Sequence, residues 1–123
     1  MIKKIVIAGC RDYENYEEAK QYIEFCIKNI REKYELVFIS GGCRGADNLG
    51  EKFARENGFE VKKYSANWKK YGRAAGPIRN EEMANDCDYV ICFWDGKSKG
   101  TKSMIELAKE KGKKVKIKMI EVA

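Results

Sequence analysis

Residues 36–47 read LVFISGGCRGAD, a short apolar run followed by a glycine-rich turn and the start of a helical pattern. Similar apolar runs occupy residues 5–8 and 89–93, and each is followed by a polar loop that contains glycine. Short continuous runs rich in β-branched and aromatic residues are typical of strands buried on both faces of a sheet. We therefore predict that these three segments form the centre of a parallel sheet.

Helical patterns separate the predicted strands. Apolar residues recur at spacings of three and four between residues 16 and 30 and again between 46 and 54, after which Gly58 is expected to end the helix. Pro77 predicts the start of another helix with glutamates in its first turn, and residues 101–111 show a fourth helical pattern. Strands and helices therefore alternate along the chain.

Two further strands complete the predicted sheet, a short one near residues 60–64 and a lysine-rich one at 114–119. Strict alternation predicts one Rossmann-like α/β domain over residues 1–123, with three layers, a mostly parallel five-stranded sheet and helices on both faces. Residues 65–76 are expected to form a long irregular loop, and loops of this length are usually functional.

The composition excludes several classes of function. The chain has 123 residues and no histidine, which excludes Ser-His-Asp triads, Cys-His dyads and His-ligated metals. Its five cysteines are scattered without a C-x-x-C pair, so neither a disulfide framework nor a thiolate metal site is expected. No apolar run approaches the ~20 residues that span a bilayer, and the first run is too short for a secretory signal. We expect a cytoplasmic protein with no membrane partner and no metal of its own.

The net charge of +6 raises the question of nucleic acid. Lysines are concentrated between residues 109 and 118, where they alternate with apolar residues in the last predicted strand. Lysines on such a strand protect a sheet edge from aggregation, and no aromatic residue is interleaved with them. This pattern favours a solvated edge, so a nucleic-acid partner is not expected.

The candidate ligand-binding residues lie in or beside the loops that follow the predicted strands, because ligands bind at the carboxyl ends of parallel strands. These loops hold most of the glycines and four of the six arginines. Arginine grips phosphate through its planar fork, and glycine-rich turns at helix N-termini add amide donors. Tight turns for the glycines and salt bridges for the arginines are the alternatives. The candidates are Gly9, Arg11, Gly41, Gly42, Arg44, Asp47, Trp68, Arg73, Arg79, Asn80, Ser98, Gly100 and Thr101.

These candidates predict a ligand that carries phosphate, with magnesium expected only if the phosphate brings it. The chain has neither G-x-G-x-x-G after its first strand nor the GK[ST] of a P-loop, so neither a standard NAD site nor an NTPase is predicted. Small domains often pair to complete a site, so a homo-oligomer is a further expectation.

Four motifs resemble those of a known family: GCRDY at 9–13, GGCRGAD at 41–47, NWKKYGRAAGPIRNEEM at 67–83 and FWDGKSKGTKSMIELA at 93–108. In this order they are similar to the YspA-type branch of the SLOG superfamily, which also contains the LOG phosphoribohydrolases and the DprA/Smf DNA-processing proteins. The resemblance implies a Rossmann-like sheet that binds a nucleotide or a nucleotide-derived ligand. Cys10 stands where we expect serine, and a thiol donates hydrogen bonds only weakly.

The resemblance leaves open whether the ligand is cleaved. Arg79 and the Gly100–Thr101 pair match LOG enzymes, but Met104 occupies the place of their catalytic glutamate. Glu106 comes two residues later and faces another direction of the helix. The remaining catalytic candidates are Arg79, Asp47 and Asp95.

Three functions are consistent with these observations. The leading hypothesis is a module that binds or senses a nucleotide-derived ligand, in which Arg79 and Arg11 meet the phosphate and Trp68 flanks the base. The first alternative is a LOG-like hydrolase that cleaves a nucleoside 5′-monophosphate into base and ribose 5-phosphate. The second alternative is DprA-like binding of single-stranded DNA.

Overall fold

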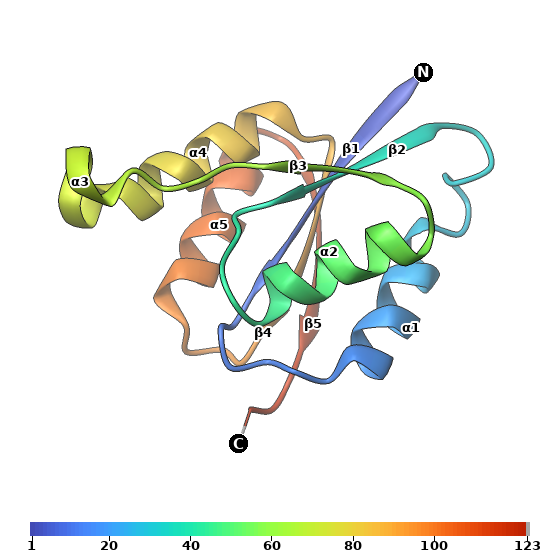
Figure 1. The fold of residues 1–123 in the computed structure, drawn as a ribbon, viewed down its shortest axis with the longest axis horizontal. Coiled ribbons are helices and arrows are strands. Elements are labelled where there is room, and N and C mark those ends of the chain that lie inside the picture. The colour runs from blue at the N-terminus through green and yellow to red at the C-terminus, as the bar shows by residue number, and fades with distance from the viewer. Residues whose placement is uncertain (123) are drawn as a thin grey trace.

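The sheet contains five parallel strands in the order β3-β2-β1-β4-β5, as seen in the computed structural model (Figure 1). The structure describes residues 1–122. The elements along the chain are β1 (Ile2–Gly9), α1 (Tyr16–Ile27), β2 (Glu35–Ser40), α2 (Ala46–Glu56), β3 (Glu60–Lys63), α3 (Trp68–Tyr71), the 3-10 helix η1 (Gly72–Ala74), α4 (Ala75–Asp86), β4 (Tyr89–Trp94), α5 (Lys99–Glu110) and β5 (Lys114–Met119). The predicted Rossmann-like α/β architecture is confirmed.

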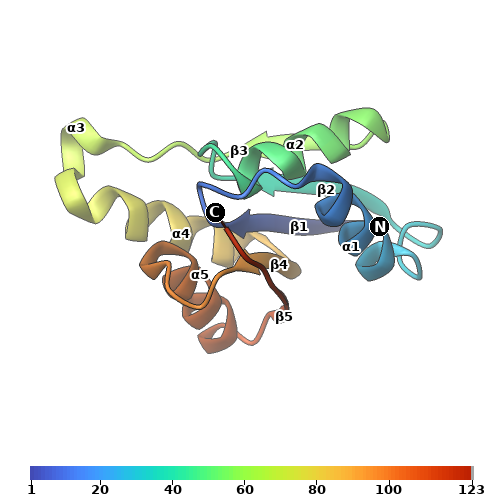
Figure 2. The same ribbon diagram turned by 90° about the horizontal axis from the view of Figure 1, so that it is seen from below.

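Helices cover both faces of the sheet (Figure 2). Neighbouring residues of β1 point to opposite faces, so Ile5 and Ile7 join the core under α1 and α2. Val6 and Ala8 join the core under α4 and α5. The strand order reverses between β1 and β4, and in sheets of this kind ligands bind at such a reversal, beside the carboxyl ends of the strands.

The predicted start of the third long helix is wrong by two residues. α4 begins at Ala75 instead of Pro77, so its first turn contains no acidic residue. Proline is accepted here because the first turn of a helix leaves its N–H groups without an intrahelical partner.

The irregular loop predicted over residues 65–76 is also corrected, because most of it is helical. Asn67 caps α3 by accepting a hydrogen bond from the backbone N–H of Lys70 at 3.1 Å. Every residue from Trp68 to Ala74 is exposed, so no buried stripe marks this segment in the sequence.

The expectations for the last strand and for the end of α2 are confirmed. β5 lies at an edge of the sheet, with Val115 and Ile117 packed against the core and Lys114 and Lys116 exposed. Gly58 follows α2 with a φ of 74°, a left-handed conformation that glycine adopts without strain. Within residues 1–122, none of the helices combines the length and apolar character needed to cross a bilayer.

Gly50 determines how closely α2 approaches β1, and therefore where the N-terminus of α2 lies. A Cβ at position 50 would lie 2.5 Å from the Cβ of Ile7, closer than side chains pack. The helix rests on the sheet at this point because glycine leaves room for Ile7.

We predict that Gly50→Ala destabilises the protein by roughly 1–3 kcal/mol, because the overlap with Ile7 outweighs the gain of up to ~1 kcal/mol in helix propensity. Gly100→Ala is the matched control, since it is also helical and a Cβ there would meet nothing within 4 Å. Urea denaturation measures both variants. A Gly50→Ala protein as stable as the wild type would contradict the close approach of α2.

Candidate functional site

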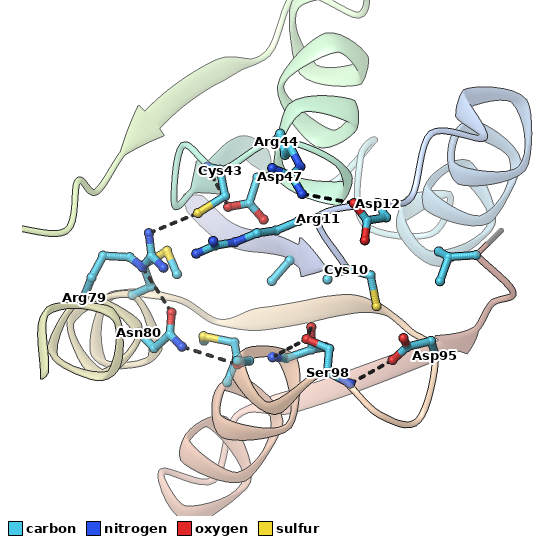
Figure 3. Close-up of a pocket in the computed structure, with 17 residues that line it drawn as sticks. Cys10, Arg11, Asp12, Cys43, Arg44, Asp47, Arg79, Asn80, Asp95 and Ser98 are labelled. Carbon is cyan, nitrogen blue, oxygen red and sulfur yellow. Dashed lines mark hydrogen bonds and ion pairs between the residues drawn. The ribbon is translucent and has the colours of Figure 1, made fainter. Parts of the chain in front are cut away.

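A polar cavity of about 390 Å³ opens at the carboxyl ends of β1, β2 and β4 (Figure 3). Most of the predicted ligand-binding residues line it. They are Gly9, Arg11, Arg44, Asp47, Arg79, Asn80, Ser98, Gly100 and Thr101. The structure therefore brings together residues from four segments that are far apart in the sequence.

Arg79 on α4 is the central cation of this cavity. Its side chain is nearly buried, with 8% of the residue exposed. Its Nη1 donates to the carbonyl oxygen of Gly41 at 2.7 Å, and its Nε donates to Oδ1 of Asn80 at 3.1 Å. Within residues 1–122, no carboxylate lies within ion-pair distance of Arg79, and its Nη2 has no hydrogen-bond partner. No carboxylate of the described residues pairs directly with this buried guanidinium, although Asp47 lies nearby, so the site has room for an anion.

Gly41 lets two charged groups approach each other. A Cβ at this position would lie 2.8 Å from Nη1 of Arg79 and 2.9 Å from Oδ2 of Asp47. The sequence analysis expected the amides of Gly41 and Gly42 to cradle phosphate. The Gly42 amide instead donates to Oγ of Ser40 at 3.0 Å, and the contribution of Gly41 is the carbonyl that holds Arg79.

Ser40 and Glu51 support this loop, and the sequence analysis missed both. Oγ of Ser40 donates to Oε2 of Glu51 at 2.6 Å, and Oε1 of Glu51 pairs with Arg55 and Lys63, each at 3.2 Å. Burial alone raises the pKa of Glu51, but the hydrogen bonds from Ser40 and Lys63 hold it below its usual range. The available signal was the position of Glu51, four residues after Asp47 and hence on the same face of α2.

Asp47 at the start of α2 has few partners. The residue is 6% exposed, and its Oδ2 accepts a hydrogen bond from the backbone N–H of Cys43 at 3.1 Å. Burial raises the pKa of the Asp47 carboxyl to about 6, even though the Cys43 amide and the guanidinium groups of Arg79 and Arg11 oppose this rise. Figure 3 shows the Arg11 side chain extending across the cavity toward Arg79.

The N-terminus of α5 forms the opposite wall. Ser98 caps the helix, with its Oγ accepting from the backbone N–H of Thr101 at 3.5 Å and from the Thr101 hydroxyl at 3.1 Å. Asn80 donates to the carbonyl of Gly100 at 3.4 Å and so ties α4 to this end of α5. The first amides of a helix attract anions.

Asp95 is occupied within its own turn. Its Oδ1 accepts from the backbone N–H groups of Ser98 and Lys97, both at 2.8 Å, and these hydrogen bonds hold its pKa below the usual range. Met104 is buried and lines the cavity, whereas Glu106 is exposed and lies 3.8 Å from Lys102. Of the two candidate catalytic carboxylates, Asp95 accepts two backbone hydrogen bonds through Oδ1, whereas Asp47 accepts one through Oδ2 and is the more deeply buried.

Four predicted ligand residues do not line the cavity, namely Gly41 and Gly42 in the loop beside it and Trp68 and Arg73 away from it. Trp68 on α3 is 52% exposed, and Arg73 in η1 is exposed as well. Neither lines the cavity, and Figure 1 shows α3 at the far end of α4 from the sheet. Arg44 does line the cavity and forms an exposed ion pair with Asp12, the type of contact that the sequence analysis gave as the alternative role of the arginines.

Metal ligation has no visible basis in residues 1–122, where no three His, Cys, Asp or Glu side chains are grouped to hold an ion. Cys10 lies in the cavity wall, and burial raises the pKa of its thiol. Its sulfur therefore stays protonated and neutral.

The fold and the cavity define a Rossmann-like α/β domain with a polar site at the point where the strand order reverses. The chain belongs to the YspA, cpYpsA-related SLOG family, whose model matches residues 3–71. The four-motif resemblance is confirmed at the level of this family.

One relative and two solved structures are similar to this chain. The chain is 36% identical over 117 residues to the Gene 61 protein of Mycobacterium phage D29, covering 90% of this chain and 92% of that protein. DNA processing protein A (DprA) from Streptococcus pneumoniae is similar in structure, with a TM-score of 0.72 and 22% identity over 95% of this chain, which spans 50% of the DprA chain. The structure of TM1055 matches with a TM-score of 0.66 and 20% identity, covering 94% of this chain and 72% of that chain. At these identities, both structures bear on the fold alone.

We predict that Asp47→Asn raises the free energy of unfolding of the ligand-free protein by roughly 1–3 kcal/mol at pH 7.5. Asparagine keeps the acceptor for the Cys43 amide and removes a buried charge. Because the pKa of Asp47 rises from 3.8 to about 6 on folding, the wild type loses stability as the pH rises through that interval. The difference between the two proteins should therefore vanish near pH 4.

Urea denaturation of both proteins at pH 4 and pH 7.5 measures this difference. Other titrating groups are shared by the two proteins, so they cancel in the comparison. A gap of equal size at both pH values would contradict the assignment to the Asp47 carboxyl.

Proposed function

We propose that this domain binds or senses a nucleotide or nucleotide-derived ligand, and that it holds the phosphate of that ligand in the cavity. The observation that carries the proposal is the buried guanidinium of Arg79. Two of its nitrogens are held by Gly41 and Asn80, and the third has no partner in residues 1–122. A guanidinium fixed through Nε and Nη1 leaves Nη2 free to donate a charge-assisted hydrogen bond to a phosphate oxygen.

The surroundings of Arg79 add further donors for an anion. The first turn of α5 forms one wall, and Arg11 reaches in from the loop after β1. Helix N-termini bind phosphate through backbone amides and through the positive end of the helix dipole. The cavity volume of about 390 Å³ lies near the lower end of the ~300–1,000 Å³ range for ligand pockets, which supports a mononucleotide-sized ligand.

We propose binding without cleavage, because a LOG-like hydrolase needs a carboxylate that faces the anomeric carbon of the ribose, a role distinct from binding the sugar hydroxyls. Splitting an N-glycosidic bond builds positive charge on the sugar, which a carboxylate stabilises. The α5 position that would supply it is Met104, and Asp95 is occupied in its own turn. The lysines of β5 lie on an edge strand, so binding of single-stranded DNA is not favoured either.

We predict that Arg79→Ala abolishes ligand binding with little change in the melting temperature of the free protein. The hydrogen bond to Gly41 is lost, but so is an uncompensated buried charge. The measurement is a thermal-shift titration with nucleoside mono- and diphosphates, NAD(P) and ADP-ribose. A ligand at ~100 times its dissociation constant adds about 2.7 kcal/mol to the stability of the wild type.

Arg73→Ala is the matched control, because it removes an exposed arginine outside the cavity and should leave the shift intact. A large loss of stability in ligand-free Arg79→Ala would make Arg79 structural. The absence of a shift with every compound would overturn the proposal. Chromatography of the incubated ligand should recover it intact, and release of free base would establish the hydrolase instead.

A further inference from the structure

We propose that the cavity takes a ribose 5-phosphate unit, with the phosphate at Arg79 and the vicinal hydroxyls of the sugar at the carboxylate of Asp47. The inference rests on the proposed function and adds the sugar selectivity of the same site. It predicts that the domain prefers ribose to 2-deoxyribose.

The inference depends on a difference between two carboxylates of α2 in the number of partners that each one has. Glu51 and Asp47 lie one turn apart and are almost equally buried, at 4% and 6% exposed. The carboxylate of Glu51 accepts a hydrogen bond from the Ser40 hydroxyl and forms ion pairs with Arg55 and Lys63. In residues 1–122, Asp47 receives one hydrogen bond, from the Cys43 amide, and its Oδ1 has no donor. Glu51 therefore has its partners within the fold, whereas Asp47 lines the cavity with an oxygen, Oδ1, that can still accept hydrogen bonds.

The charges around the Asp47 carboxylate restrict which groups of a ligand can donate hydrogen bonds to it. An ionised carboxylate only accepts hydrogen bonds, and about four lone-pair directions are available on its two oxygens. A cationic group at Asp47 would meet the charges of Arg79 and Arg11, which already act on this carboxylate, although Asp12 and Asp95 balance the arginines of the cavity as a whole. Neutral donors remain, and a pair of adjacent hydroxyls supplies two of them to one carboxylate.

The short separation between Asp47 and Arg79 favours the sugar over the base as the source of these donors. Oδ2 of Asp47 and Nη1 of Arg79 both lie within 3 Å of the same point, the Cβ position that Gly41 leaves empty. In a nucleotide, the ribose hydroxyls lie closer to the 5′-phosphate than most of the base does. A ligand anchored by phosphate at Arg79 therefore presents its sugar near Asp47.

The test is an NMR titration of ¹⁵N-labelled protein with inorganic phosphate, ribose 5-phosphate and 2-deoxyribose 5-phosphate. Millimolar concentrations of these probes report weak binding, and none of them depends on the identity of the base. We expect the wild type to bind ribose 5-phosphate at least roughly tenfold more tightly than the deoxy sugar, since a hydrogen bond to a charged group is worth that much. In Asp47→Asn, the two sugars should bind equally within about twofold.

Asp12→Asn is the matched control, because Asp12 also lines the cavity but is exposed and paired with Arg44. It removes the same charge and should keep the preference for ribose. Equal binding of the two sugars to the wild type would overturn the inference while leaving the phosphate site standing. Failure of all three probes to bind the wild type would remove the proposed function itself. Tighter binding of every probe to Asp47→Asn would show that Asp47 only repels anions, which also overturns the inference.

Discussion

The hydrogen bond from Nη1 of Arg79 to the carbonyl of Gly41 is the contact on which the cavity depends. It joins α4, which packs on one face of the sheet, to the loop that leads into α2 on the other face. A charged donor makes a stronger hydrogen bond than a neutral amide, so this contact fixes the guanidinium in the cavity, while packing on the sheet holds the two layers in place. Since position 41 carries no side chain, the guanidinium can also lie beside Asp47 without displacing the loop.

The cavity holds two nearly buried charged residues whose remaining free polar atoms face the cavity. Arg79 and Asp47 are both buried, yet they do not form an ion pair with each other or with another residue of 1–122. Each such group lowers the stability of the ligand-free protein, because burial removes hydration without supplying a full set of partners. Elsewhere the same helix satisfies its buried charge, as Glu51 shows. A ligand with both an anion and neutral donors would relieve both deficits at once, which is the physical basis of the proposals made here.

The sequence predicted the features that follow from local pattern. Apolar runs marked β1, β2 and β4, and loop position alone selected Arg79, Asp47 and Ser98, which the structure brings into one cavity. The helical segment around Trp68 was missed because it is short and fully exposed, so it has no apolar period. The support of the loop by Ser40 and Glu51 was missed because it depends on side chains eleven residues apart meeting across a helix and a strand. The close approach of Arg79 and Asp47 at Gly41 was not foreseen for a related reason, since a missing side chain matters only once its neighbours are known.

Binding of the ribose hydroxyls and cleavage of the glycosidic bond would both require the carboxylate of Asp47. With Met104 on α5 and Asp95 held in its turn, Asp47 is the remaining candidate carboxylate that could stabilise a cationic sugar. A carboxylate engaged with the ribose hydroxyls is shielded from the anomeric carbon, and two nearby guanidinium groups oppose positive charge there. The arrangement that would give the domain its preference for ribose is therefore the same one that would disable hydrolysis.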